Sequence, residues 1–125
     1  MRRQSSSSGG PFEDVYGYHR AVRAGGQVHV SGTTARAPDL DGDAYDQARA
    51  AWRIVEEALR AVGSSLEAVV RTVTYVTDMR DHELVARAHR EVLGQVRPAA
   101  TLVAVSALID PRMKVEIEVY AVEPE

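Results

Sequence analysis

Two glutamates near the end of the chain are candidates for a catalytic acid or base. Glu116 and Glu118 alternate with apolar residues in the sequence VEIEV, so a strand here places both carboxylates on one face. The spacing alone favours a solvated strand face. A carboxylate held at a subunit border would instead be partly buried, which suits general acid or base catalysis.

The other polar candidates point more weakly to chemistry. Ser31 and Gly32 end a β-prone run, but the pattern lacks the leading glycine of a nucleophile elbow, so we expect no triad serine. His82 and His89 lie seven residues apart on one predicted helix, about two turns, whereas helical metal ligands lie one turn apart. We therefore expect no metal. His89 follows Val85 by four residues and borders the apolar stripe of that helix.

The composition excludes several classes of function. The 125-residue chain is 45% hydrophobic, enough for one core. Its formal net charge is −3 and its basic residues are scattered, so we expect no nucleic-acid partner. No apolar run approaches the ~20 residues of a membrane helix, so we expect no membrane partner either. The absence of cysteine fits a cytoplasmic protein, and no sequence feature indicates a cofactor.

The first ten residues differ from the rest of the chain. Residues 1–10 read MRRQSSSSGG, and such a Ser/Gly run cannot bury enough apolar surface to fold. We predict a disordered tail over 1–10 and a single domain over 11–125.

Hydrophobic periodicity predicts the elements that must position these side chains. The runs YHRAVRA and QVHVSG flank two glycines and indicate a hairpin. Helical spacing of apolar residues predicts one helix over 43–63, capped by Asp43, and a second over 81–93, capped by Asp81. The runs AVVRTVTYVT, TLVAVSAL and KVEIEVYAV predict three further strands, the first of them central.

The resulting order is β-β-α-β-α-β-β, an α+β fold with a mixed sheet. Crossovers of normal handedness place both helices on one face of that sheet. No helix remains to cover the other face, so we predict a homo-oligomer in which a second subunit covers it.

Four separated motifs together resemble the RidA (YjgF) superfamily. They are GYHRAVRAGGQVHVSGTTA, VTYVTDM, RPAATLVAVSALIDP and VEIEVYAV, and they occur in the family's order between Pro11 and Val122. The resemblance implies a chorismate-mutase-like fold and a homotrimer with a cleft between neighbouring subunits. For RidA itself it implies hydrolysis of 2-imino or enamine acids to 2-keto acids and ammonia.

The resemblance also implies site residues. The family's cleft tyrosine falls on Tyr18, its serine-glycine pair on Ser31 and Gly32, and its water-activating glutamate on Glu116. The arginine of the family's Pro-Ala-Arg-Ser/Thr motif, which binds the substrate carboxylate, falls on Ala100. With Glu116 as the catalytic residue, the predicted substrate-binding residues are Tyr18, Ser31, Gly32, His89, Ala100, Thr101 and Leu102.

The alanine at position 100 removes a charged anchor. A charge-assisted pair contributes ~1.5–3 kcal/mol, so its loss weakens binding of a carboxylate by roughly one to two orders of magnitude. We therefore expect the cleft to favour a neutral or cationic ligand. Arg71, Arg97 and Arg112 are alternative anchors, although arginine is more often found at the surface.

Three functions stay open from the sequence. The first is an atypical hydrolase or tailoring enzyme that acts on an imine or enamine, with Glu116 as acid or base. The second is a non-catalytic trimer that binds a small molecule or regulates. The third is the family's reported ribonuclease activity, which finds no support in the distribution of charge.

Overall fold

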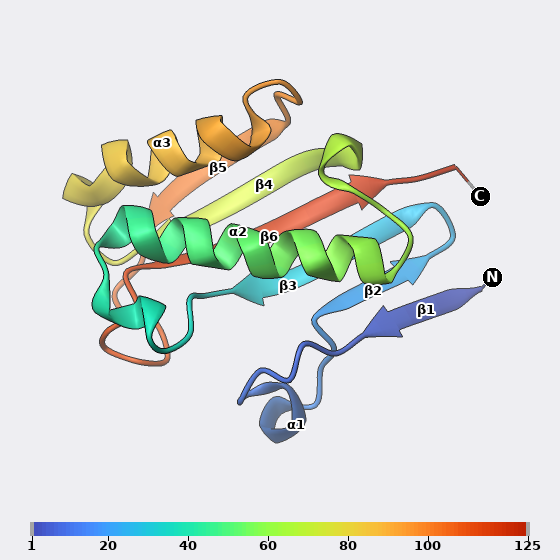
Figure 1. Cartoon of the computed structure of the whole chain (residues 1–125), viewed down its shortest axis with the longest axis horizontal. Helices are drawn as coiled ribbons and strands as arrows, with labels where there is room; N and C mark the ends of the chain where they lie inside the picture. The colour runs from blue at the N-terminus through green and yellow to red at the C-terminus, as the bar shows by residue number, and fades with distance from the viewer. Residues whose placement is uncertain (1, 125) are drawn as a thin grey trace.

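A computed structural model of the chain describes residues 2–124 and places six strands in one mixed sheet (Figure 1). The strands are β1 (Arg3–Ser6), β2 (Ala21–Ala24), β3 (Gln27–Thr33), β4 (Val69–Val76), β5 (Ala99–Ala104) and β6 (Val115–Val122). The helices are α1 (Glu13–Tyr16), α2 (Ala44–Ala61) and α3 (His82–Leu93), with 3-10 turns η1 (Asp39–Asp41), η2 (Leu66–Ala68) and η3 (Met79–Asp81).

The strand that carries Glu116 and Glu118 lies inside the sheet. The order is β1-β2-β3-β6-β4-β5, so β6 is bonded on both sides, to β3 and to β4. All neighbours are antiparallel except β4 and β5, which are parallel. The register between β3 and β6 is irregular between Val30 and Thr33, which is where the Ser31-Gly32 pair lies. The predicted mixed sheet and its central strand β4 are confirmed.

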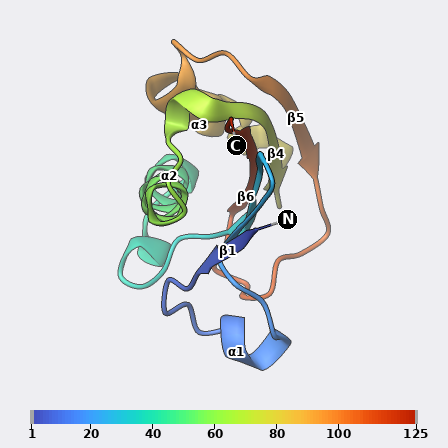
Figure 2. The same cartoon turned by 90° about the vertical axis from the view of Figure 1, so that its right-hand side faces the viewer.

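The two long helices pack on one face of the sheet, as predicted (Figure 2). Helix α2 begins after Asp43, whose side chain accepts a hydrogen bond from the Asp46 N–H, while the Asp46 carboxylate accepts one from the Asp43 N–H. This capping box satisfies two free amides at the start of the helix. Helix α2 buries Trp52, Val55 and Leu59 in the core against the sheet. None of the helices in the described part of the chain is both long enough and apolar enough to cross a membrane.

Within residues 2–124, no helix lies over the opposite face of the sheet. Its side chains form a polar cluster in which the Tyr75 hydroxyl donates to Glu118 at 2.9 Å and the Tyr120 hydroxyl donates to the same carboxylate. The hydrogen bond to Glu118 raises the pKa of Tyr120 to about 12. The outer strand β5 also exposes its apolar residues to solvent in the single chain. Within one chain β4 is covered on one face only: Thr72 and Thr74 are buried under the helices, whereas Arg71 on the other face is exposed.

The N-terminal segment differs from the predicted disordered tail. Residues 3–6 form β1, which pairs antiparallel with β2 from Arg3 opposite Ala24 to Ser6 opposite Ala21. The composition of the segment did not reveal this because pairing at a sheet edge uses backbone N–H and C=O groups, which β2 offers whatever side chains the new strand carries. Met1, part of the same prediction, lies outside the described residues.

Candidate functional site

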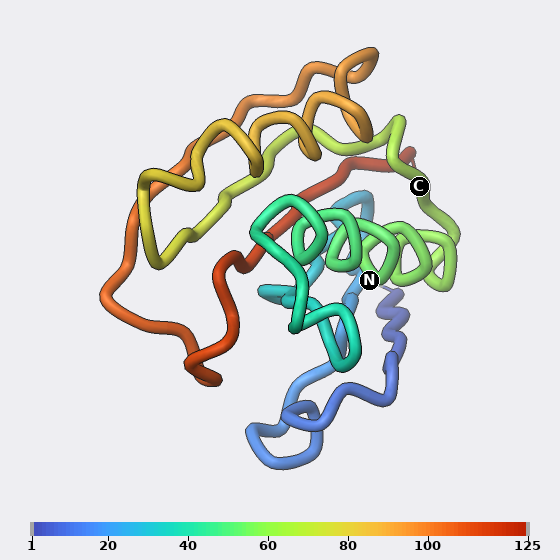
Figure 3. The backbone as a smooth tube through the Cα atoms, turned by 60° about the vertical axis from the view of Figure 1, so that its left-hand side comes forward, coloured from blue at the N-terminus to red at the C-terminus, as the bar shows by residue number. Residues whose placement is uncertain are grey.

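A cavity of about 630 Å³ lies at one end of the sheet, next to Glu116. Its walls come from the loop around α1, the end of β3 and the loop that precedes β6. The α1 loop and the loop before β6 both lie at the lower end of the molecule in Figure 3. The residues lining it that bear on the chemistry are Phe12, Tyr16, Tyr18, Gly32, Met113 and Glu116. Three of the predicted site residues therefore meet here.

Two carboxylates line this cavity: Asp110 is paired with Arg112, whereas Glu116 is unpaired and half-buried. Burial raises the pKa of its carboxyl; the charge of Arg20 lowers it and the charge of Glu118 raises it, and the net direction is upward. Among residues 2–124 no group donates a hydrogen bond to this carboxylate. A glutamate with a raised pKa and free oxygens is suited to take a proton from water.

Gly32 gives the Glu116 carboxylate its place. A Cβ atom at position 32 would lie 2.6 Å from the Glu116 Oε2 atom, closer than any real contact of a Cβ atom. Within the serine-glycine pair, it is therefore the missing side chain of Gly32 that leaves room for the Glu116 carboxylate. Ser31 does not line the cavity; its hydroxyl donates to the His19 carbonyl at 2.7 Å, which holds the strand to the preceding loop.

Arg20 is a cavity residue that the sequence analysis missed. It is 5% exposed, and its guanidinium donates to the Gly32 carbonyl at 2.7 Å and to the Tyr18 hydroxyl at 3.1 Å. It also lies 3.5 Å from the buried Glu13 carboxylate. Arg20 thus orients Tyr18 and the strand beside Glu116. Tyr18 and Arg20 precede β2, which begins at Ala21, so the alternation of that strand gives no signal for Arg20.

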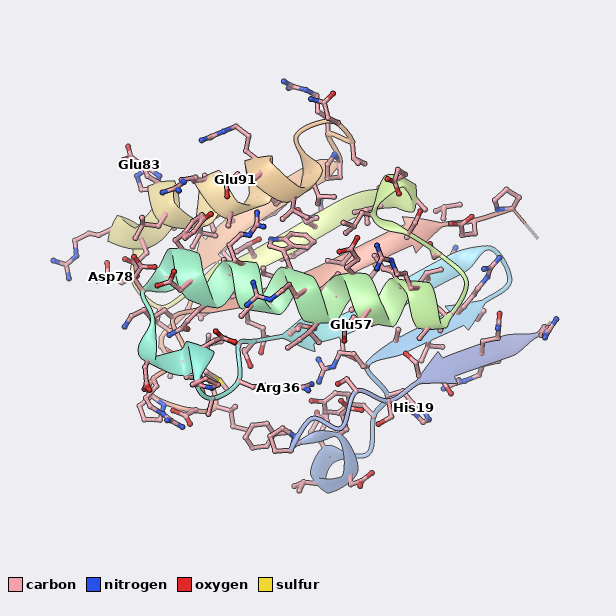
Figure 4. All side chains as sticks on the ribbon, viewed as in Figure 1. His19, Arg36, Glu57, Asp78, Glu83 and Glu91 are labelled. Carbon is pink, nitrogen blue, oxygen red and sulfur yellow. The ribbon has the colours of Figure 1, made fainter. Side chains whose placement is uncertain are left out.

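The N-terminal segment supplies part of the cavity wall. Ser7 and Ser8 donate to the Glu13 carboxylate, and Arg36, labelled in Figure 4, donates to the Ser8 carbonyl at 3.0 Å. Burial alone would raise the pKa of Glu13, but the hydrogen bonds from the two serines outweigh it and lower the pKa from 4.5 to about 2. Glu13 therefore stays ionised and ties the segment to the two arginines.

The remaining predicted residues form a second, separate cavity. This space of about 250 Å³ lies between α3 and β5 and is lined by His89, Ala100, Thr101 and Leu102. His89 is bonded to the Thr72 hydroxyl at 2.9 Å, and burial lowers its pKa. Its ring packs edge-on against that of Trp52 at 5.7 Å. These contacts fix the orientation of the His89 ring at the wall of the second cavity.

Within one chain the two cavities do not meet. Thr74 on β4 is opposite both Leu102 and Ile117, so Leu102 shares the helix-covered face with Ile117, whereas Glu116 points to the other face. Sequence reasoning grouped these residues in one cleft. The structure of the chain brings together Tyr18, Gly32 and Glu116, and separately His89, Ala100, Thr101 and Leu102.

The three alternative arginines lie in different places. Arg112 lines the Glu116 cavity, but its guanidinium is 2.9 Å from the Asp110 carboxylate. Arg71 donates to the Thr101 hydroxyl at 2.9 Å on the uncovered face. Arg97 lies in the turn before β5 with φ of 55° and lines neither cavity. No group of three histidine, aspartate or glutamate side chains within residues 2–124 could hold a metal ion.

Comparison with known proteins shows what this chain is similar to. The family model described as Endoribonuclease L-PSP matches residues 12–123. The protein SCO2049 of Streptomyces coelicolor is 42% identical over 117 residues, which cover 91% of this chain and 87% of that protein. The mouse 2-iminobutanoate/2-iminopropanoate deaminase is 29% identical over 115 residues, covering 91% and 82%.

A solved structure agrees with the fold. The crystal structure of Rv2704 from Mycobacterium tuberculosis, of the YjgF/YER057c/UK114 family, superimposes with a TM-score of 0.90 at 44% identity. The match covers 97% of this chain and 99% of that one. The fold class predicted from the motifs is thereby confirmed.

Proposed function

This chain belongs to the Endoribonuclease L-PSP family, which is the RidA/YjgF superfamily, and from that premise we propose that it hydrolyses an imine or enamine at Glu116. The observation that carries the proposal is the half-buried Glu116 carboxylate, which faces a 630 Å³ cavity with its pKa raised. The similarity to a mouse protein named as an imine deaminase supports the choice of reaction.

The chemistry needs one base and one water. The Glu116 carboxylate takes a proton from water while the water oxygen bonds to the imine carbon, and the C=N electron pair moves to nitrogen, which is protonated. The resulting carbinolamine loses its nitrogen as ammonia or an amine, leaving a carbonyl product. The sum is one imine and one water converted to one carbonyl compound and one amine, with no oxidation.

The complete cleft, in this proposal, is shared by two subunits of a homotrimer. The exposed strand β5 of one subunit, with Ala100, Thr101 and Leu102, lies against the Glu116 cavity of its neighbour. The proposal is supported by the apolar residues that β5 exposes and by the separation of the two cavities within one chain. A neighbour would also cover the sheet face that has no helix.

The ligand in this proposal carries no carboxylate. Position 100 offers a methyl group, and the arginines of the Glu116 cavity are already bonded to other groups of the chain. A carboxylate would have to break one of these bonds to find a cation. Ribonuclease chemistry is less well supported, because the net charge is −3 and several arginines are paired with acids.

The direct test follows ammonia release from imines. Purified protein is mixed with an amine-derived imine and, separately, with an amino-acid-derived imine, and release is timed against buffer for wild type, Glu116→Gln and Glu118→Gln. We expect release by wild type that is lost in Glu116→Gln and kept in Glu118→Gln, because only Glu116 lines the cavity. Equal activity in wild type and Glu116→Gln would overturn the proposal.

Two further readouts separate the alternatives. Ala100→Arg should raise activity toward the imine with a carboxylate and not toward the other, because it supplies a bidentate partner. A ligand that stabilises wild type and Glu116→Gln alike and is not consumed would instead establish a binding protein.

A further inference from the structure

Three large apolar side chains at the mouth of the Glu116 cavity are exposed. Val15 is 84% exposed, Tyr16 is 86% exposed and Ile109 is 69% exposed, yet all three line the cavity. We call these three residues the apolar lip. They come from two loops, α1 on one side and the loop before β6 on the other. Since they bury little, they contribute little to folding, and such a patch marks a binding surface.

The cavity is also large for a small imine. It measures about 630 Å³. A molecule of six or seven non-hydrogen atoms fills less than about a third of it, even at about 30 Å³ for each atom, the share of one water in the liquid. Cavities of several hundred Å³ are typical of ligands that carry a ring or a long apolar chain.

The polar groups around the cavity are largely engaged with one another. Arg20 is bonded to the Gly32 carbonyl, Arg36 to the Ser8 carbonyl and Arg112 to the Asp110 carboxylate. Among the charged side chains that line the space, Glu116 is the one that makes no hydrogen bond within residues 2–124. Apart from Thr34, the uncharged side chains that line the space are apolar or aromatic, and the rings of Tyr16 and Tyr18 meet edge to face at 6.0 Å.

We infer that the cavity accepts an uncharged imine or enamine with a ring-sized apolar group, and that the apolar lip contacts this group. The inference rests on the proposed function and adds the substrate class. The reacting carbon lies beside Glu116, and the apolar group extends past Tyr18 to the lip. Val15, Tyr16 and Ile109 then determine specificity for size, while Glu116 acts on the C=N bond that every substrate shares.

The test compares two imines that differ in the apolar group. The imine of acetophenone and the imine of acetone are given to wild type, to the double variant Val15→Ala/Tyr16→Ala and to Ile109→Ala. We expect wild type to prefer the acetophenone imine by tenfold or more in kcat/KM, as burial of a ring would give. The lip variants should lose most of this preference, because their kcat/KM should fall much further with the acetophenone imine than with the acetone imine. Val122→Ala, exposed at the far end of β6, is the matched control and should change neither rate.

Two other measurements decide the remaining outcomes. If neither imine is turned over, the lip can still be tested by comparing the thermal stabilisation that acetophenone and acetone give. Stabilisation of wild type by acetophenone that is lost in the lip variants would support the inference even though the proposed reaction fails. Equal effects of the lip variants on both imines would overturn it. Sedimentation of the variants as smaller species would overturn it too, because the lip would then be a contact between subunits.

Discussion

At the scale of single residues, two neighbouring glutamates on one strand have different roles because of what lies across from them. Glu118 accepts hydrogen bonds from Tyr75 and Tyr120, which occupy both of its oxygens. Glu116 lies against Gly32, where no side chain competes for the space. One carboxylate is thereby fixed in a structural cluster, and the other is free to react.

The placement of Glu116 beside a glycine gives a prediction about activity without loss of fold. Gly32→Ala adds a methyl group 2.6 Å from the present position of Oε2, so the flexible end of Glu116 must move. We expect kcat to fall by about tenfold or more, since general-base catalysis depends on position. The free energy of unfolding in urea should change by less than about 1 kcal/mol, because only a side-chain terminus is displaced. A variant with wild-type kcat would show that the carboxylate need not lie where it does.

The raised pKa of Glu116 gives a prediction about pH. A group whose pKa is higher in the folded state than in the unfolded chain destabilises the protein as pH rises from its ordinary value, 4.5, through the raised value. Glu116→Gln removes this titration. We expect the variant to be as stable as wild type at acid pH and more stable at neutral pH, measured by urea unfolding over a pH series. Lower stability of the variant at neutral pH would contradict the assignment of burial as the main cause.

The sequence revealed these residues only in part. The alternation in VEIEV places Glu116 and Glu118 on one face, which the structure confirms, but it treats them as equals. What distinguishes them comes from β3 and β4, which are distant in sequence. Arg20 was missed for a related reason: it has the appearance of a surface arginine until its partners, Glu13 and the Gly32 carbonyl, are brought to it by the fold.

At the scale of elements, two helices that look alike in sequence begin in different ways. An aspartate precedes both, but only the Asp43 side chain caps its helix, with Asp46 completing the box. Asp81 makes no such bond at the start of α3. Both helix starts were predicted correctly, whereas the bond itself depends on backbone angles at the cap, which periodicity does not report.

The two aspartates form a matched pair for a stability experiment. Asp43→Ala removes the side chain that accepts from the Asp46 N–H, and we expect it to lower the free energy of unfolding by about 1 kcal/mol. Asp81→Ala removes no capping bond and should have an effect within about 0.5 kcal/mol. Thermal or urea unfolding of the two variants measures the difference. Equal losses would mean that both side chains cap in solution.

The edge strands were the least predictable elements. Strand β1 carries no apolar alternation, so its pairing with β2 has no signal in the side chains. Strand β5 is apolar except at Thr101, which predicts a buried strand, yet within one chain its apolar residues are exposed. The pairing of β1 depends on its backbone hydrogen bonds, whereas the apolar surface of β5 suits contact with a neighbouring subunit.

At the scale of the whole molecule, the proposed trimer makes each cleft the product of two chains. Mixing two inactive variants tests this. Glu116→Gln inactivates the part of the cleft that contains the Glu116 cavity. Leu102→Arg places a charge on β5 and is designed to inactivate the part that the neighbouring subunit supplies. After the chains are unfolded and refolded together in equal amounts, about a quarter of the clefts pair two intact halves, so about a quarter of wild-type activity should return. No recovery, when both variants are trimeric, would show that each chain forms its own site.

The position of β6 in the sheet also decides which parts of the molecule can open. β6 is hydrogen-bonded on both sides, so its amide protons should be among the last to exchange with solvent. The wall of the cavity is held instead by β1 at the sheet edge and by the Glu13 carboxylate that binds Ser7 and Ser8. Because β1 is an edge strand, we expect the amide protons of this wall to exchange earlier than those of β6, so the wall can open locally while Glu116 keeps its place.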